Sequence, residues 1–286
     1  MDWARIKSCL LHAVLLALTL TGGSLYAESA PQLSADVSSV PSAVPLWMLP
    51  FSHDSGTIEA PPPNLAPDLA LRTFEQRQHS QLAELPSYSA AVVINAILPD
   101  TFQKGEFQLR RKYIAPRTLQ FTPVRFTGDN FVKTNVISRV LQSEVDHVVK
   151  GEGPDTAIDD ENYKFTYKGT EVLDGIPSHV YQVKPRKRRM GLFKGRIFLN
   201  AATGNLQRAE GVLVKSPSLF IRKIGFVQDY TTLAGYTVPR HIYSVAGTRL
   251  VGQVVVDIAT SDYELLPPPA QDAESTSANV NRKGSE

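Results

Sequence analysis

Hydrophobic and polar residues alternate through most of the chain between residues 88 and 263, which is the pattern of half-buried β-strands. In residues 105–115, polar residues separate the inward-facing positions, which are Phe107, Leu109, Arg111 and Tyr113. Similar runs predict strands over residues 88–98, 105–115, 118–126, 163–172, 179–183, 192–199, 206–214, 219–230, 237–245 and 249–263. Short connections between successive runs, including a turn expected at Gly247, indicate antiparallel neighbours.

Two segments follow the 3.6-residue period of amphipathic helices instead. Residues 65–85 carry apolar side chains at helical spacing, with Pro67 in the first turn. Residues 130–149 carry a second apolar stripe, and Asp129 or Asn130 is expected to cap this helix by accepting a backbone N–H. The pattern predicts an α+β fold: one large, curled antiparallel sheet, with one helix before it and one inserted after the third strand.

Residues 1–27 combine basic residues near the start, an apolar run and a small residue, Ala27, at the expected cleavage site. This pattern predicts a secretory signal peptide, so we expect the protein to be periplasmic. Residues 28–63 are a proline-rich leader, residues 64–266 are the expected folded domain, and residues 267–286 are a tail expected to be disordered.

Composition and motifs narrow the function classes. The single cysteine, Cys9, lies in the predicted signal peptide, so the exported chain would have no disulfide and no cysteine nucleophile. The formal net charge of +2 gives no reason to expect a nucleic-acid partner.

The sequence lacks the common nucleophile-elbow, zinc-protease and phosphate-loop motifs, so we expect no enzyme and no cofactor. A Ser/His/Asp set that only the folded structure brings together stays open. Acidic residues crowd residues 152–161 without the spacing of a calcium loop and are interpreted as solvated rather than as a metal site.

Four stretches carry a resemblance to a known group of proteins: residues 162–169 (NYKFTYKG), 180–185 (VYQVKP), 191–200 (GLFKGRIFLN) and 202–204 (ATG). Over residues 65–265 the chain resembles the periplasmic lipoprotein carriers, which comprise LolA-like proteins, outer-membrane lipoprotein-sorting proteins and lipid-binding regulators of envelope stress. The resemblance implies an unclosed β-barrel of about ten to eleven antiparallel strands, lidded by helices over an apolar cavity.

Aromatic and aliphatic side chains on this framework are candidates for lining a cavity that receives acyl chains. They are Phe131, Phe165, Tyr167, Tyr181, Phe193, Ile197, Phe220 and Phe226. Burying one methylene contributes about 0.8 kcal/mol, so apolar contact alone would hold a chain. Alternation shows that a face is buried without showing what covers it, so an ordinary filled core is the alternative. The helix over residues 130–149 is likewise either a lid that opens or a fixed part of the core.

Five cations cluster where a hairpin turn is expected. They are Lys184, Arg186, Lys187, Arg188 and Arg189. Because arginine pairs with phosphate groups bidentately, this hairpin is a candidate contact for lipid head groups or for an anionic membrane surface. A solvated loop is the alternative.

These features together predict non-enzymatic periplasmic binding or transport of a lipid or lipoprotein acyl group in an apolar cavity. The alternative function is an envelope regulatory or scaffolding domain that binds a protein partner through its sheet edge or its proline-rich leader.

Overall fold

The computed structural model describes residues 63–150, 156–216 and 219–267. Apart from Pro63, these residues belong to one compact unit. The predicted signal peptide lies outside the described residues, as do the leader except Pro63 and the tail except Pro267. None of the helices in the described ranges is long and apolar enough to cross a membrane.

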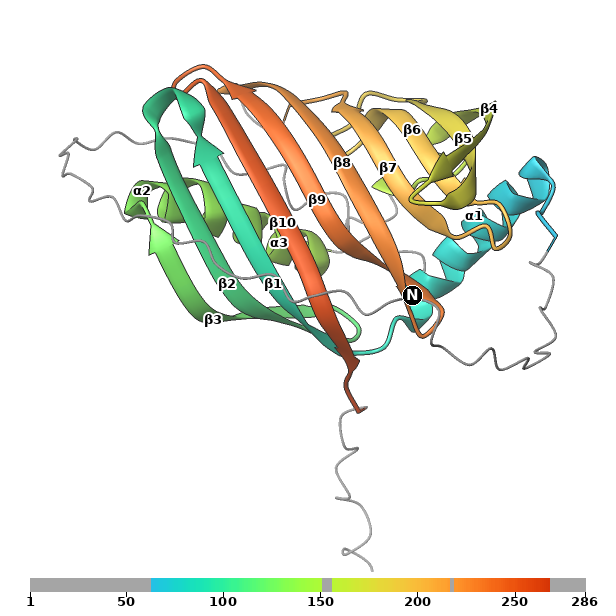
Figure 1. The fold of residues 1–286 in the computed structure, drawn as a ribbon, viewed down its shortest axis with the longest axis horizontal. Coiled ribbons are helices and arrows are strands. Elements are labelled where there is room, and N and C mark those ends of the chain that lie inside the picture. Colours follow the sequence, from blue (N-terminus) through green and yellow to red (C-terminus); the bar gives the residue numbers. More distant parts are fainter. Residues whose placement is uncertain (1–62, 151–155, 217–218, 268–286) are drawn as a thin grey trace, which may run out of the picture. The chain divides into compact units, whose positions relative to one another are not determined.

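Ten antiparallel strands form a single sheet, which confirms the predicted α+β fold with an unclosed, curled sheet (Figure 1). The strands are β1 (Tyr88–Leu98), β2 (Gln103–Ile114), β3 (Thr118–Gly128), β4 (Tyr163–Leu173), β5 (Ile176–Pro185), β6 (Phe193–Asn200), β7 (Leu206–Leu213), β8 (Ile221–Leu233), β9 (Tyr236–Thr248) and β10 (Gln253–Leu265). Their order across the sheet is β3-β2-β1-β10-β9-β8-β7-β6-β5-β4. The first and last strands are therefore neighbours, and β3 and β4 are the two edges of this sheet.

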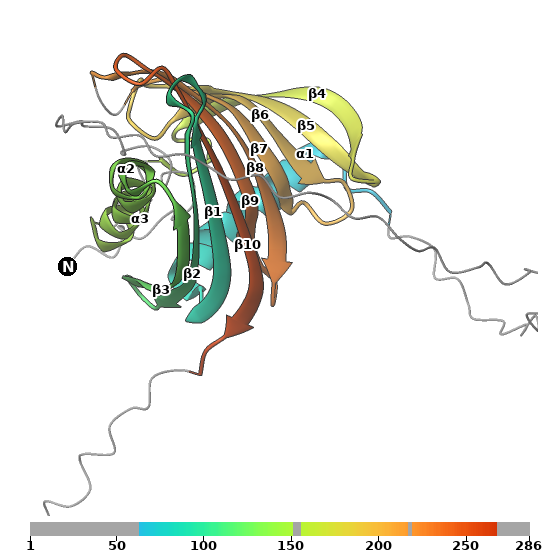
Figure 2. The same ribbon diagram turned by 60° about the vertical axis from the view of Figure 1, so that its left-hand side comes forward.

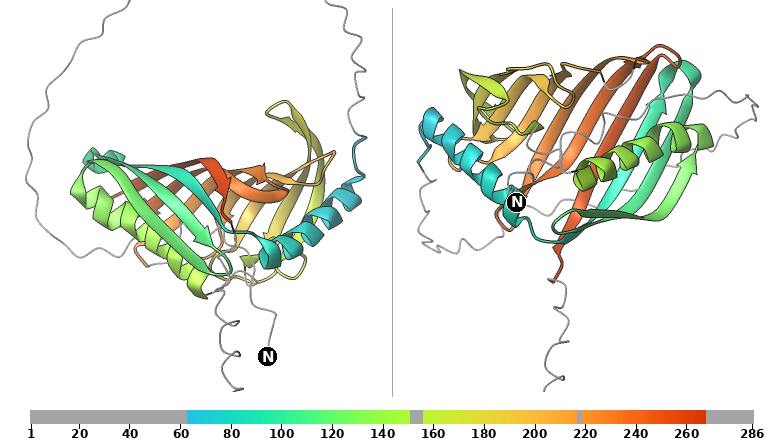
Figure 3. Two further views of the ribbon diagram at one scale, coloured as in Figure 1. Left: turned by 90° about the horizontal axis from the view of Figure 1, so that it is seen from below. Right: turned by 180° about the vertical axis from the view of Figure 1, so that it is seen from behind.

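Helices pack against the concave side of the sheet at two places (Figures 2 and 3). The first, α1 (Pro67–Glu84), crosses the β5–β9 part of the sheet. At its start the Tyr181 hydroxyl donates a hydrogen bond to the carbonyl oxygen of Pro67 at 2.6 Å, and near its end the Gln81 amide donates to the carbonyl oxygen of Thr237 at 2.7 Å. These bonds fix both ends of α1 to the sheet.

The second helical segment lies over β1, β2 and β3 (Figure 2). It consists of α2 (Asn130–Val132), a π-helical turn η3 (Lys133–Ile137) and α3 (Ser138–Lys150). The side-chain cap expected from Asp129 is wrong: Asp129 makes no such bond to the helix, and its carboxylate accepts the backbone N–H of Lys104 at 2.9 Å instead. The side chain therefore links the start of the helix to β2.

One predicted turn is also wrong. Gly247 lies inside β9, where it pairs with Gln253 of β10, and the turn occupies residues 249–252. Gly252 has a φ of +70°, a conformation that glycine adopts without strain, so the reversal of the chain falls there. β10 consequently begins four residues later than the alternation predicts.

The close contact between β6 and β7 depends on two glycines that face each other, Gly195 and Gly211. A Cβ on Gly195 would lie 1.8 Å from the carbonyl oxygen of Glu210, which no side-chain adjustment relieves. A Cβ on Gly247 in β9 would meet no atom within 4 Å.

We therefore expect Gly195→Ala to lower the free energy of unfolding by about 1–3 kcal/mol, because the two strands must separate. The matched substitution Gly247→Ala should change it by less than about 1 kcal/mol. Urea unfolding followed by circular dichroism measures both values. Equal effects of the two substitutions would show that the β6–β7 approach is not a packing constraint.

Candidate functional site

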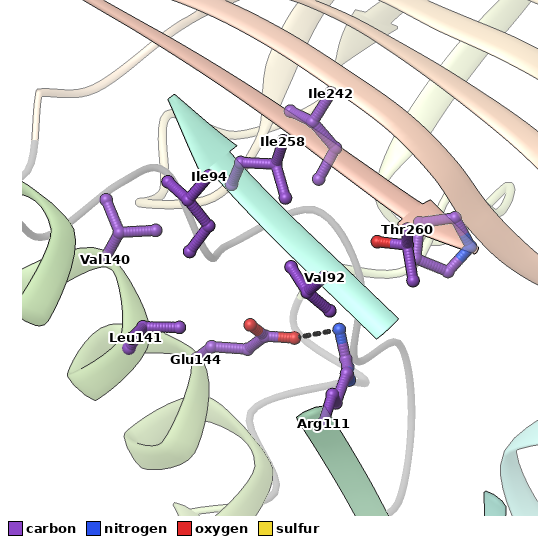
Figure 4. A pocket seen from close by; sticks show the side chains of 10 residues that line it. Val92, Ile94, Arg111, Val140, Leu141, Glu144, Ile242, Ile258 and Thr260 are labelled. Atoms are coloured by element: carbon purple, nitrogen blue, oxygen red, sulfur yellow. Dashed lines mark ion pairs between the residues drawn. The ribbon is translucent and has the colours of Figure 1, made fainter. Parts of the chain in front are cut away.

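A small pocket lies between α3 and the concave face of the sheet (Figure 4). Its volume is about 20 Å³. Four strands and the helix contribute its lining, which consists of Val92, Ile94, Arg111, Val140, Leu141, Glu144, Pro239, Ile242, Ile258 and Thr260. Six of these side chains are aliphatic, so the pocket is apolar apart from one buried pair of charges and one hydroxyl.

Strand register explains why these side chains meet. Val92 of β1 pairs with Thr260 of β10, and Ile94 pairs with Ile258. Ile258 in turn pairs with Ile242 of β9. Because side chains alternate between the two faces of a strand, directly paired residues share a face, and this set lines the inner one.

The helical segment covers the pocket with Val140, Leu141 and Glu144, two of which belong to its buried stripe. Residues at successive intervals of four are buried along this segment: Val132, Val136, Val140, Glu144 and Val148. Residues four apart lie on one side of a helix, so Glu144 stands within an otherwise apolar stripe. The carboxylate consequently points at the sheet rather than at solvent.

Arg111 of β2 is the partner of Glu144, and Figure 4 shows their ion pair at one end of the pocket. The two side chains are only 6% and 9% exposed. The guanidinium carbon also lies 5.9 Å from the centre of the Tyr88 ring. Burial raises the pKa of Glu144 above its ordinary value, and the charges of Arg111 and His147 offset only part of this rise. Each charge depends on the other here, because an unpaired charge in such surroundings is costly.

The pocket as it stands is too small for an acyl chain. A water molecule needs about 10–15 Å³ of such space, so 20 Å³ accommodates about one water. A hydrocarbon chain would fit between α3 and the sheet only if the helix moved away.

The eight predicted cavity residues do not line this pocket. Five belong to, or pack against, a core cluster over β4–β8 that also contains Phe74 of α1; they are Phe165, Tyr181, Phe193, Ile197 and Phe226. Tyr167 and Phe220 are partly exposed, and Phe131 is half-buried in α2. Their role in ligand binding stays a prediction.

The predicted basic hairpin connects β5 to β6, and part of it is tied to neighbouring loops. Arg186 donates through Nε to the carbonyl oxygens of Asp160 and Tyr163, at 2.7 and 3.1 Å. Arg188 donates through Nη2 to the carbonyl oxygen of Val214 at 3.0 Å. Lys184 and Lys187 are exposed, and Arg189 is half-buried.

The acidic loop departs from its solvated interpretation at one residue within the described range. Asp159 is buried, and its Oδ1 accepts the backbone N–H of Asn162 at 3.0 Å. It therefore shapes the loop that precedes β4. Among the described residues, no group of three or more histidine, cysteine, aspartate or glutamate side chains is arranged to hold a metal ion.

No family model matches the sequence, and no curated protein matches it. Similar solved structures include a LolA superfamily protein from Nitrosomonas europaea, with 12% identity, a TM-score of 0.39 and coverage of 72% of this chain and 96% of that one. A DUF1329 family protein from Desulfovibrio piger is 14% identical, with a TM-score of 0.37 over 73% and 93% of the two chains. A MucA/MucB complex from Pseudomonas aeruginosa includes a chain with 11% identity and a TM-score of 0.22, over 70% and 99%. Likenesses this distant do not indicate what a chain binds.

The buried ion pair yields a test of how α3 is held. Glu144→Ala should lower the free energy of unfolding by about 3–5 kcal/mol, because it leaves the Arg111 charge buried without its carboxylate. The double replacement Arg111→Met with Glu144→Leu should cost clearly less than the single one, since it removes both charges and keeps apolar volume. Chemical denaturation of the two variants and the wild type measures the difference. A double variant as unstable as Glu144→Ala, or more so, would contradict this coupling.

Proposed function

We propose that the protein binds or transports a lipid or lipoprotein acyl group in the periplasm, without catalysing a reaction. The acyl chain would lie between α3 and the inner face of the sheet. One observation supports this location above the others: an aliphatic-walled pocket lies beneath an amphipathic helix, and a single buried ion pair accounts for its charged groups.

The hydrophobic effect supplies the driving force. Each buried methylene contributes about 0.8 kcal/mol, so a chain that buries ten of them gains about 8 kcal/mol. The opposing cost is the loss of the contacts that α3 makes with the sheet. A long chain therefore favours the open arrangement and a short one does not, which predicts selectivity by chain length.

The π-helical turn η3 offers a place for α3 to pivot. Such turns interrupt the regular hydrogen bonding of a helix and occur often at functional sites. Val136 and Ile137 in this turn stay buried against the sheet. Movement of the α3 half alone would thus open the pocket while α2 remains docked.

The pocket under α3 is preferred to the predicted aromatic set as the primary site. Phe193 and Ile197 are fully buried in a cluster that includes Phe74 of α1. An acyl chain at those residues would have to displace α1, which is bonded to the sheet at both ends.

A second candidate function is binding of a protein partner through a sheet edge. Edge strands present unpaired backbone groups to which an extended segment can add. Most side chains of β3 and β4 are exposed, including Val124 and Val172.

Uptake of a fluorescent fatty acid tests the first function and its location. Leu141→Asp, which places a charge in the pocket lining, should weaken binding of the probe at least tenfold. Val149→Asp places the same charge on the exposed side of the same helix and should leave binding unchanged. Chemical denaturation of both variants shows whether they are folded under the conditions of the binding assay.

Native mass spectrometry of the gently purified wild type gives the complementary readout, with co-purified lipid expected. A lipid-free mass together with no probe uptake would contradict the function. Equal uptake by Leu141→Asp and the wild type would contradict the location alone.

A further inference from the structure

Four connections between strands lie along the same end of the sheet, the upper edge in Figure 1. Together with some flanking strand residues, these connections are called the upper rim. It comprises residues 99–104, 186–191, 214–216, 219–223 and 249–252. The predicted basic hairpin is one of these segments.

Hydrogen bonds join the upper rim into a continuous surface. The backbone N–H of Gln253, next to the β9–β10 turn, donates to the carboxylate of Asp100 in the β1–β2 turn at 3.3 Å. The backbone N–H of Arg249 donates to the carbonyl oxygen of Phe220 at 2.9 Å. The Arg188 guanidinium donates to the carbonyl oxygen of Val214, which links the basic hairpin to the same surface.

The connections at the two ends of the sheet differ in charge. The connections of the upper rim alone carry six cations and one anion, Asp100; the cations are Arg186, Lys187, Arg188, Arg189, Lys215 and Arg249. Flanking strand residues add Lys104, Arg222 and Lys223, and the exposed carboxylates of Asp160 and Glu161 lie in the segment that Arg186 contacts. The connections at the opposite end, residues 115–117, 174–175, 201–205 and 234–235, hold one cation and one anion. The carbonyl bonds of Arg186 and Arg188 fix these groups in position and leave their positive charge intact.

Large apolar side chains project between these cations. Phe102 is 94% exposed, Leu219 87% and Leu250 57%. Each comes from a different connection. Phe102 also has a φ of +55°, in the left-handed region that a phenylalanine rarely adopts, so the turn holds an aromatic ring out toward solvent. Exposed apolar tips among cations fit a surface that is both apolar and negatively charged.

We propose that the upper rim docks the protein onto the surface of an anionic lipid bilayer. The cations would face phosphate groups and the apolar tips would enter the interfacial region. Docking of this kind is independent of acyl-chain binding under α3, because none of the pocket-lining residues belongs to the rim.

Vesicle co-sedimentation of the full chain tests the proposal, with phosphatidylglycerol vesicles compared with phosphatidylcholine vesicles. The wild type should bind the anionic vesicles and bind them more weakly as salt is raised. The triple variant Lys187→Gln, Lys223→Gln, Arg249→Gln should lose about 100-fold in affinity, since each cation near an anionic surface contributes about fivefold.

The matched control removes three exposed cations elsewhere: Arg72→Gln, Lys112→Gln, Lys168→Gln. Each triple variant changes the formal net charge from +2 to −1 (2 − 3), so a difference between them reports position rather than total charge. The apolar pair Phe102→Ser and Leu219→Ser should also weaken binding, whereas Val124→Ser and Val172→Ser on the edge strands should not.

Three results would overturn the proposal: no binding by the wild type, equal binding to both kinds of vesicle, or equal loss in the rim and control triple variants. Fatty-acid uptake by the rim variants should match the wild type, which separates failure of docking from failure of acyl binding.

Discussion

The ion pair between Arg111 and Glu144 is the interaction on which the arrangement of α3 depends. It places two charges among mostly apolar side chains, where removing either one leaves the other at a high cost. A hydrophobic contact in the same place would hold the helix without orientation, because apolar packing is non-directional. The pair therefore fixes how α3 lies on the sheet. Moving α3 away from the sheet requires that this ion pair break.

The two halves of the concave face are covered differently. Over β4–β8, Phe74 of α1 joins a dense cluster of aromatic and aliphatic side chains. Over β1, β2, β9 and β10, α3 leaves a small apolar pocket. A guest chain would therefore compete with α3 rather than with α1. The upper rim lies at one end of the same sheet, so membrane contact and acyl binding would use separate residues.

Period-two alternation predicted all ten strands, and the 3.6-residue stripe predicted both helical regions. The alternation also placed Arg111 on the inner face of its strand, since Phe107, Leu109 and Tyr113 share that face. The four-residue spacing from Val132 to Val148 includes Glu144. Each member of the buried pair is thus visible in the sequence as a charge within an apolar pattern: Arg111 in the strand and Glu144 in the helix. What the pattern lacked was the pairing of strands far apart in sequence, such as β1 with β10, which brings Ile94 beside Ile258.

The aromatic residues show the limit of this reasoning. Alternation placed Phe193 and Ile197 on a buried face, but it carried no information about whether α1 or a ligand covers them. Photolabelling with a diazirine-bearing fatty acid separates these cases most directly. If the acyl chain lies under α3, peptides that contain Val140, Leu141 or Ile258 should be labelled saturably. Labelling confined to peptides of β6 and α1, or labelling that excess unlabelled fatty acid does not suppress, would contradict this location.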